Sequence, residues 1–410
     1  MSAALELVDA GHDVTVLEAR PTLGGAVQTL PRRAGDPEPP PDNGQHIALG
    51  CFGAYIGFLE RVGTDGSLRR LPLELRVIDE RGRVSTIRDG VTSLLRYAHL
   101  PVAARFRVAL ALAGMRGRSE VANERTFGDF LRKRGQSDAA IDRFWDVFMR
   151  PALNLRSDEA AAEVGLFTVQ TALLAGAGAS DVLLPTAPLG QMHGEAAGRA
   201  LTTAGARIRT QARVTDVTRD AVTLDGGERI GADGIVVAVP PGESARLLGE
   251  PEPPLADSPI VSVHLLFDRR ILDWPLAALL GSDAHWVFDR GALTGHEPER
   301  GQYLTVVSSG APELLELRGR ELVDRLAGQL IERLGAAELL WSRVSREPHA
   351  TIALRPNALP LRASARTPRP NVARAGAWTD TGWPATMEGA VRSGITAARV
   401  LSDMATKIAA

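Results

Sequence analysis

Apolar and polar residues at the start of the chain follow the order helix, turn and strand. Residues 2–10 place apolar side chains at helix-compatible positions, and Gly11 is a typical helix stop. The β-branched run Val14–Leu17 then predicts a short strand of a buried parallel sheet. Glu18 follows at the carboxyl end of this strand, where open α/β sheets bind their ligands. Its carboxylate can accept both hydroxyls of a ribose, but a solvent-exposed glutamate at a strand end has the same pattern.

A second α/β pattern occupies the middle of the chain. Residues 188–205 have helical periodicity, and residues 206–217 are strand-like. A hairpin is indicated at 221–231 by its Asp-Gly turn, and the apolar strand 234–239 follows it. We expect this last strand to contact Val14–Leu17, so that distant parts of the chain build one layer.

Four other segments have simple patterns. Residues 31–42 are rich in proline and predict a surface loop. Residues 55–62 and 139–151 have apolar side chains at helical spacing and predict two packed helices. Residues 68–88 alternate apolar and charged side chains, and within them the segment 74–87 predicts a hairpin that turns at Arg81–Gly82.

The C-terminal segment predicts a helix that begins at Pro384, because proline is favoured in a first helical turn. Gly389 and Gly394 each cost about 1 kcal/mol relative to alanine inside such a helix. We therefore interpret them as positions where another backbone or a flat ligand comes close. The free N–H donors at the helix start suit an electronegative group, such as the C2 carbonyl of a flavin. The apolar face of this helix consists of Met387, Ala390, Val391, Ala398 and Leu401.

Composition narrows the class of protein. A formal net charge of −2 over 410 residues gives no whole-chain argument for nucleic acid, and we expect none as a partner. The single cysteine, Cys51, excludes an internal disulfide and fits a reducing compartment. The N-terminus lacks the basic region of a secretory signal, and no apolar run approaches the roughly 18 residues that span a bilayer. We therefore expect a cytoplasmic protein, and no metal, because no His or Cys pair has metal-ligand spacing.

Residues 95–118 have a distinctive charge pattern. They include five arginines and no carboxylate among many apolar side chains. A cationic amphipathic helix of this kind can lie on an anionic membrane, which predicts peripheral contact with the inner face of the membrane. The alternative is an ordinary helix on the surface of a domain.

Four motifs carry a resemblance to a known family. They are LEARPTLGG at 17–25, DNGQH at 42–46, GASDVLLP at 178–185 and WTDTGWPATMEGAVRSG at 378–394. In this order and spacing, the chain resembles the FAD-dependent amine oxidase and phytoene desaturase superfamily over nearly its whole length. Within that superfamily it looks most like the hydroxysqualene dehydroxylases. The first and last motifs occur widely among flavoenzymes, and the combination of DNGQH with PATMEGAVRSG is more specific.

The resemblance implies an α/β fold in which a Rossmann-like FAD-binding domain, truncated at its N-terminus, is interleaved with an α+β substrate domain. The FAD-binding domain is expected to be discontinuous, built from residues 1–65, 165–250 and 365–410. The substrate domain is expected to comprise residues 66–164 and 251–364.

The resemblance also implies roles for individual residues. Glu18 is expected to bind the adenosine ribose of FAD. Asn43, Gln45 and His46 are expected near the reactive face of the flavin, and Trp383 on the substrate or flavin face. We consider His46 the candidate general acid, because the pKa of histidine can be tuned near neutrality. The other cofactor contacts implied are Arg20, Gly24, Gly25, Val214, Gly376, Met387, Glu388, Gly389 and Ala390.

The chain departs from the family pattern in three places. The family usually begins with a strand and a Gly-x-Gly-x-x-Gly turn ahead of the helix at 2–10, and the sequence has no such turn there. Ala26 stands where the family usually has arginine, and Ala377 where it usually has an aspartate that helps hold the ribityl-phosphate part of FAD. We therefore expect a dinucleotide fold whose phosphate loop is absent from the chain as given, through a misassigned start or truncation rather than natural loss. We also expect weak FAD binding by this chain.

The activity implied is the reductive dehydroxylation of hydroxysqualene, a long apolar isoprenoid, to squalene. FAD would be the cofactor, NAD(P)H or another reductant the electron source, and squalene-synthase-like enzymes functional partners. One alternative is a flavoenzyme of the carotenoid desaturase or amine oxidase type, which runs the flavin in the oxidative direction. Another is a truncated or degenerate homologue without enzymatic activity.

Overall fold

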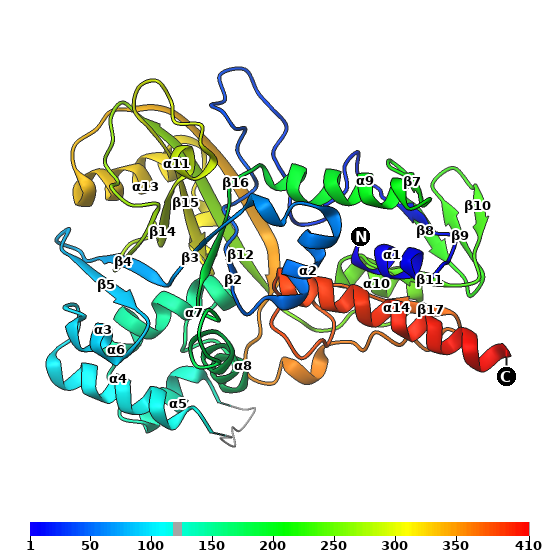
Figure 1. Ribbon diagram of the computed structural model, residues 1–410, viewed down its shortest axis with the longest axis horizontal. Helices are drawn as coiled ribbons and strands as arrows, with labels where there is room; N and C mark the ends of the chain where they lie inside the picture. Colours follow the sequence, from blue (N-terminus) through cyan, green and yellow to red (C-terminus); the bar gives the residue numbers. More distant parts are fainter. Residues whose placement is uncertain (118–124, 410) are drawn as a thin grey trace.

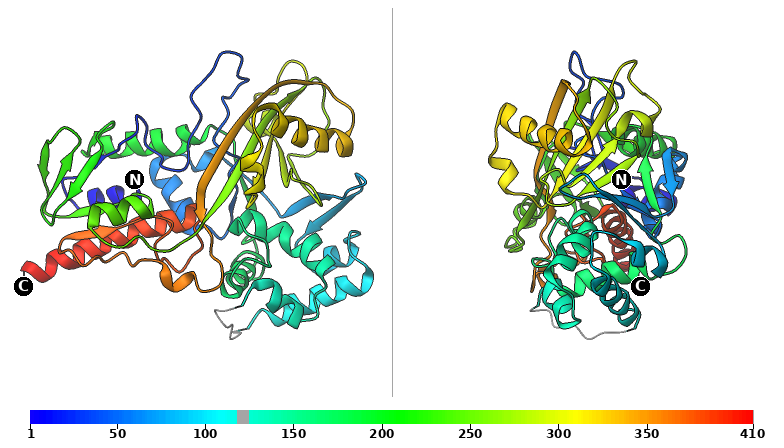
Figure 2. Two further views of the ribbon diagram at one scale, coloured as in Figure 1. Left: turned by 180° about the vertical axis from the view of Figure 1, so that it is seen from behind. Right: turned by 90° about the vertical axis from the view of Figure 1, so that its left-hand side faces the viewer.

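Two parts of the molecule lie end to end along its long axis (Figure 1). The computed structural model describes residues 1–117 and 125–409. One part holds both chain ends, in helix α1 (Ser2–Asp9) and helix α14 (Met387–Ala409). The other part is built on a seven-stranded sheet, and both views in Figure 2 show the same division.

The part with the chain ends contains two separate two-stranded parallel sheets. Strand β1 (Thr15–Leu17) pairs with β7 (Arg207–Arg209), and β11 (Ile235–Val237) pairs with β17 (Val372–Arg374). Leu17 of β1 packs on the apolar cluster that contains the side chains of β11. The two distant segments thus share one apolar cluster, but they belong to separate sheets and do not pair as strands.

A three-stranded antiparallel sheet lies at the outer end of this part. Its strands are β10 (Arg229–Gly231), β9 (Ala221–Leu224) and β8 (Val214–Val217), in that order. The hairpin expected at 221–231 is thus confirmed. Helix α9 (Ala196–Thr203) runs alongside β7, where helical periodicity predicted it.

Helices α1 and α14 pack closely, and a glycine makes this possible. A Cβ on Gly394 would lie 2.8 Å from both the Ala3 main-chain nitrogen and the Ser2 Cβ. The Ser2 hydroxyl also donates a hydrogen bond to the Val391 carbonyl at 3.0 Å. The close approach expected at Gly394 is therefore the approach of another backbone.

The seven-stranded sheet separates two apolar layers. Helix α13 (Gly319–Leu334) covers one face, where Leu322 and Leu326 join the core formed with Val263 and Val306. On the opposite face Phe288 packs among the helices that follow residue 91. The strand order is β16 (Leu339–Ile352), β12 (Asp257–Phe267), β15 (Gln302–Ser309), β14 (Trp286–Asp289), β13 (Leu276–Leu279), β4 (Glu74–Ile78) and β5 (Val84–Arg88).

The structure corrects two helix predictions. The segment 95–118 is not one helix, because α3 (Val91–Arg96) ends before Pro101, which then precedes α4 (Val102–Gly114). Arg118 lies outside the described residues. The C-terminal helix begins at Met387 and not at Pro384, because the Pro384 carbonyl folds back to accept the Thr386 N–H at 2.8 Å.

The hairpin predicted over residues 74–87 is confirmed. Strands β4 and β5 form it, with Gly82 at a φ of 72° in the turn. Strand β3 (Leu68–Leu71) instead pairs with β6 (Val182–Pro185), which also pairs with β2 (Ala48–Leu49).

The remaining helices surround these sheets. The helix expected at 55–62 is confirmed as α2. The helix expected at 139–151 is interrupted by a π-helical turn at 141–145, and Pro151 lies inside its last segment. The bounds are α2 (Gly53–Val62), α5 (Phe127–Lys133), α6 (Asp138–Ala140), α7 (Asp146–Leu153), α8 (Ala162–Thr168), α10 (Pro241–Leu248), α11 (Arg290–Thr294) and α12 (Glu313–Glu316).

Candidate active site

Asp42 joins segments from both parts of the molecule. Its carboxylate accepts a hydrogen bond from the Thr29 hydroxyl at 2.6 Å and from the Leu189 N–H at 3.0 Å. The Arg290 guanidinium pairs with it at 2.8 Å, and both side chains are only 2% exposed. The Asp42 carbonyl also accepts a hydrogen bond from Nε2 of His264 in β12, at 2.9 Å. The start of the DNGQH motif is therefore fixed against the seven-stranded sheet.

Asn43 ties this motif to the Gly-Gly loop. Its main-chain N–H donates to the Gln28 carbonyl at 2.9 Å, and its side-chain amide donates to the Ala26 carbonyl at 2.8 Å. Gly24 has a φ of 128°, and a Cβ there would lie 2.6 Å from a main-chain carbonyl oxygen of the loop. Gly25, at a φ of 60°, faces open space. Asn43 therefore holds the loop through two hydrogen bonds, and Gly25 leaves space free next to the loop.

The end of β1 lies beside the segment that leads into β8 and Val214. The Glu18 carbonyl accepts a hydrogen bond from the Ala212 N–H at 2.9 Å. The half-buried Glu18 carboxylate accepts one from the Arg20 N–H at 2.8 Å, and the Arg20 guanidinium donates to the Gly25 carbonyl at 3.1 Å. The structure thus brings four of the expected cofactor residues into one region.

The Glu388 side chain connects the first turn of α14 to the start of α2. Its buried carboxylate accepts hydrogen bonds from the N–H groups of Ala54 at 3.1 Å and Tyr55 at 2.8 Å, at the start of α2. Because it caps α2 in this way, only its main chain is left to face a cofactor. Gly376 has a φ of 147°, and its N–H donates to the Ser393 hydroxyl of α14 at 2.9 Å.

The first turn of α14, Met387–Ala390, offers main-chain donors. Thr386 accepts the N–H of Gly389 through its hydroxyl at 3.3 Å and the N–H of Ala390 through its carbonyl at 2.9 Å. The first two N–H groups of the helix have no acceptor in the part of the chain that the structure describes. A Cβ on Gly389 would lie 2.5 Å from the Pro384 carbonyl oxygen, so this glycine is required by the backbone itself.

His46 and His193 lie in the same region as two neutral imidazoles. His46 is half-buried beside the buried Gln45, and its Nδ1 donates to the Gly44 carbonyl at 3.1 Å. Burial lowers the pKa of His46. His193 accepts the Tyr55 hydroxyl at Nε2, at 2.8 Å, and burial lowers its pKa to about 4. At neutral pH both rings are therefore uncharged, and only the outer nitrogen of His46 is left for proton transfer.

Trp383 belongs to an aromatic cluster next to these groups. Its ring meets Phe52 edge-on, with centroids 5.9 Å apart, and Phe167 edge-on at 5.2 Å. The Arg392 guanidinium lies 4.7 Å from the centroid of its ring. The cluster gives the region an apolar wall with a cation on one side.

Three residues of this network were not expected from the sequence. Arg290 of α11 and His264 of β12 hold Asp42, and His193 holds Tyr55. Asp42 itself was visible as the first residue of DNGQH. Its partners lie far along the chain in segments without a motif, so no local signal identifies them.

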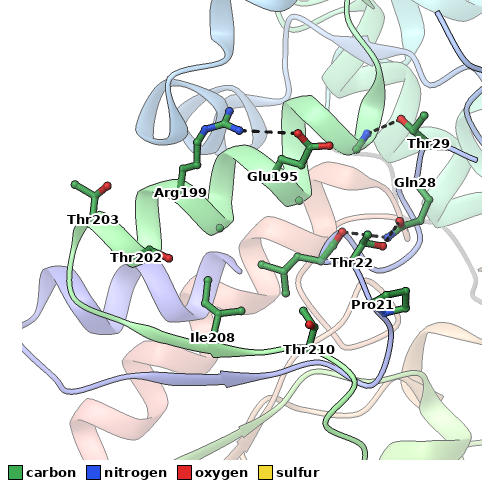
Figure 3. Close-up of a pocket in the computed structure, with 14 residues that line it drawn as sticks. Pro21, Thr22, Gln28, Thr29, Glu195, Arg199, Thr202, Thr203, Ile208 and Thr210 are labelled. Atoms are coloured by element: carbon green, nitrogen blue, oxygen red, sulfur yellow. Dashed lines mark hydrogen bonds and ion pairs between the residues drawn. The ribbon is translucent and has the colours of Figure 1, made fainter. Parts of the chain in front are cut away.

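A separate groove of about 640 Å³ lies between the Gly-Gly loop and α9. Figure 3 shows Thr22 and Gln28 on the loop and Glu195 and Arg199 on the helical segment, where these two pair with each other. The Thr22 hydroxyl and the Gln28 side chain are already bonded to each other and to the loop. Neither the end of β1 nor the start of α14 lines this groove, so we do not assign it to the cofactor.

Comparisons with known proteins cover nearly the whole chain. A family model described as flavin containing amine oxidoreductase matches residues 1–402. The chain is 26% identical to a hydroxysqualene dehydroxylase of Sinorhizobium fredii and 28% identical to one of Rhodopseudomonas palustris, each over 97% of this chain and 94% of the relative. It is 24% identical to a 15-cis-phytoene desaturase of Narcissus pseudonarcissus, over 96% of this chain and 76% of that protein.

Solved structures show the same fold. The cyclohexylamine oxidase of Brevibacterium oxydans superposes with a TM-score of 0.70 and 18% identity, covering 99% of this chain and 97% of that one. At this identity the likeness shows the fold alone. The α/β fold with a Rossmann-like cofactor part, expected from the motifs, is thus confirmed.

The residues brought together fit FAD. A carboxylate stands at the end of β1, and Gly25 leaves open space above the neighbouring loop. The first two N–H groups of α14, which have no acceptor among the described residues, can donate to the electronegative edge of a flavin ring. Within the described ranges, no group of three His, Cys, Asp or Glu side chains is placed to hold a metal ion.

Proposed function

The chain belongs to the flavin containing amine oxidoreductase family and is an FAD-dependent oxidoreductase, and on this premise we propose that it reduces hydroxysqualene to squalene. The observation that carries the proposal is the match to two hydroxysqualene dehydroxylases over almost their entire length. In the proposed reaction the C–O bond breaks, a hydride forms the new C–H bond, and a proton leaves with the hydroxyl as water. When bound and reduced, the flavin would supply the hydride, and NAD(P)H or another reductant would supply the two electrons that restore its reduced form.

The proposed cofactor contacts follow from the geometry. Glu18 would accept the ribose hydroxyls, and the first N–H groups of α14 would donate to the flavin. Gly24, Gly25 and Gly376 would let main chain approach the cofactor. Arg20, Val214 and the Met387–Ala390 turn would line the same site, with Glu388 contributing through its main chain alone.

We assign the proton to Nε2 of His46. Its Nδ1 already donates to the Gly44 carbonyl, so Nε2 is the nitrogen that can carry a second, transferable proton. Because burial lowers the pKa of His46, the protonated ring is a stronger acid than an exposed histidine and is less populated at neutral pH. Asn43 and Gln45 would then position other groups and would not transfer protons, since Asn43 holds the Gly-Gly loop.

The apolar surroundings suit a long hydrocarbon. Trp383, Phe52 and Phe167 form one aromatic wall, and Trp286 and Phe288 extend the apolar face of the sheet. Water-free packing of this kind protects a developing allylic cation from capture by solvent.

The test is an anaerobic assay of the purified, FAD-loaded protein with hydroxysqualene and NAD(P)H or dithionite. Squalene, detected by mass spectrometry, is the expected product. Formation of new double bonds from phytoene with a quinone acceptor would favour the desaturase alternative. A flavin spectrum without turnover of either substrate, in a folded protein, would favour a homologue without activity.

We propose that the α4 surface rests on an anionic membrane. Val102, Phe106 and Leu110 are 60%, 54% and 73% exposed at one-turn spacing, which is unusual for large apolar side chains. Residues 95–117 carry arginine and no carboxylate, and Arg107 is exposed beside this stripe. No described helix is both long and apolar enough to cross a membrane. The proposed location is the cytoplasmic face, next to squalene-synthase-like enzymes that would supply the substrate.

We also propose the division of the chain into a discontinuous FAD-binding domain, residues 1–65, 165–250 and 365–410, and a substrate domain, residues 66–164 and 251–364. The supporting observation is that strands from residues 15–17, 207–209, 235–237 and 372–374 pair or pack with one another.

A further inference from the structure

Arg362 is a buried cation that holds the loop before α14. Its side chain is only 7% exposed. The guanidinium donates to the carbonyl of Ala377 at 3.0 Å, to that of Trp378 at 3.3 Å and to that of Trp383 at 2.6 Å. Three carbonyl oxygens of one short loop are therefore turned toward a single side chain. These three hydrogen bonds fix the conformation of the loop, and with it the position of the start of α14.

The charge of Arg362 has no carboxylate partner in the part of the chain that the structure describes, and this distinguishes it from the other buried arginines. Burial lowers its pKa, and the exposed Asp380 is the acid that opposes this effect from a distance. Burying a charge without an ionic partner destabilises the folded protein, so such a charge indicates a functional role. The buried arginines with a carboxylate partner are Arg290 with Asp42, Arg343 with Asp36 and Arg374 with Glu250.

The loop held by Arg362 has further hydrogen bonds that do not involve Arg362. The indole N–H of Trp378 donates to the Val239 carbonyl at 3.0 Å, and Gly376 is held by Ser393. The loop therefore has other contacts that keep it folded, and neutralising Arg362 removes a charge without removing every support.

We propose that Arg362 is a positioning residue for the flavin. It fixes the position of the first turn of α14, and its charge makes the electrostatic potential there more positive. A fixed positive charge stabilises added negative charge at short range. The flavin gains negative charge when it is reduced, so Arg362 raises its reduction potential. The inference uses the FAD cofactor of the family and does not depend on the proposed substrate.

The experiment compares Arg362→Lys and Arg362→Gln with the wild-type protein. FAD affinity is measured by fluorescence titration, and the two-electron potential of the bound flavin by equilibration with reference dyes. Arg362→Gln should bind FAD about tenfold more weakly and bind reduced FAD a further tenfold more weakly, which is a potential lower by about 30 mV. Arg362→Lys keeps the charge and loses the three-carbonyl geometry, so it should lose affinity and keep most of the potential.

Arg369 provides a matched control. Its guanidinium also donates to main-chain carbonyls, those of Val217 and Leu247, and forms no ion pair within the described ranges, but it lies away from the start of α14. Arg369→Gln should leave the flavin potential unchanged, even where the melting temperature falls. Equal potentials in Arg362→Gln and wild type would overturn the proposal.

A second measurement needs no bound flavin. Hydrogen–deuterium exchange of the apo-protein should show faster exchange at 376–389 in both Arg362 variants and unchanged exchange there in Arg369→Gln. Unchanged exchange in the Arg362 variants would overturn the positioning role, whatever their FAD content. If the variants lost only squalene formation, the result would bear on the proposed reaction and would leave the role of Arg362 unaffected.

Discussion

Asp42 and Arg290 form an ion pair at 2.8 Å with both side chains 2% exposed, and the pair joins the DNGQH motif to the seven-stranded sheet. The carboxylate also accepts hydrogen bonds from Thr29 and from the Leu189 N–H, so both of its oxygens have partners. A buried charge pair of this kind gives little stability compared with apolar packing, but it is costly to break from one side. It therefore helps to fix the relative position of the part that holds both chain ends and the part built on the seven-stranded sheet.

Removing one partner of this pair should destabilise the protein strongly. We expect Asp42→Asn to lower the free energy of unfolding by about 3–5 kcal/mol, because Arg290 is left as an unpaired buried charge. The double variant Asp42→Asn with Arg290→Met should recover part of this loss. Urea unfolding followed by circular dichroism measures both. A single variant that unfolds at the wild-type urea concentration would contradict the account.

Activity should depend on pH through His46. In the proposed mechanism the protonated imidazolium is the acid, and it is populated below the pKa of His46, which burial lowers from its ordinary value. We therefore expect kcat/KM to rise as the pH falls from neutrality toward that lowered pKa, in the range where the protein stays folded. His46→Gln should remove this limb of the profile and reduce kcat by about 10²–10⁴-fold.

The control for this profile is His349→Gln. His349 is exposed and pairs with Asp257 on the outer surface, so its loss should leave the pH dependence unchanged. An unaltered acidic limb in His46→Gln would assign the proton to another group.

Local patterns predicted the elements that form by local rules. The helix at 2–10, the strand at Val14–Leu17 and the hairpin at 221–231 follow directly from periodicity and turn residues. The motifs predicted which segments meet at the cofactor region, and Glu18, Arg20 and Gly25 do lie together.

Long-range pairing was not predictable in the same way. Nothing in the segment around Arg290 indicates that its side chain meets Asp42, because the two are joined only by the tertiary fold. Glu388 as a cofactor contact stays a prediction, but no local signal indicates that its side chain caps α2, a helix far away in sequence. The break before α4 was visible as Pro101, but the charge pattern of 95–118 suggested one continuous helix.

The contact between α1 and α14 should tolerate no side chain at Gly394. We expect Gly394→Ala to destabilise the protein by about 1–3 kcal/mol, because the new Cβ meets main chain and the Ser2 side chain and one helix must move. Gly57 in α2 is the matched control, since a Cβ there meets nothing within 4 Å. Gly57→Ala should stabilise by about 0.5–1 kcal/mol, through helix propensity. Thermal unfolding of both variants checks the difference in sign.

Glu18 should contribute to FAD affinity through its charge. We expect Glu18→Gln to weaken FAD binding about tenfold, because hydrogen bonds to a charged acceptor contribute about 1.5–3 kcal/mol and those to a neutral one less. Glu6→Gln, on the exposed face of α1, should leave the affinity unchanged. Fluorescence titration of the apo-protein with FAD measures both, and equal affinities would remove Glu18 from the ribose site.

The α4 surface should determine binding to anionic membranes. Arg105 is a poor target, because its guanidinium holds the carbonyls of Leu95 and Leu100 inside the protein. We therefore expect Phe106→Ser combined with Arg107→Glu to abolish sedimentation with phosphatidylglycerol liposomes while the melting temperature changes little, since both side chains are exposed. A matched pair on another surface, Leu340→Ser with Arg320→Glu, should sediment like wild type. Sedimentation that is unchanged in the α4 variant, or lost equally in both, would leave α4 as an ordinary surface helix.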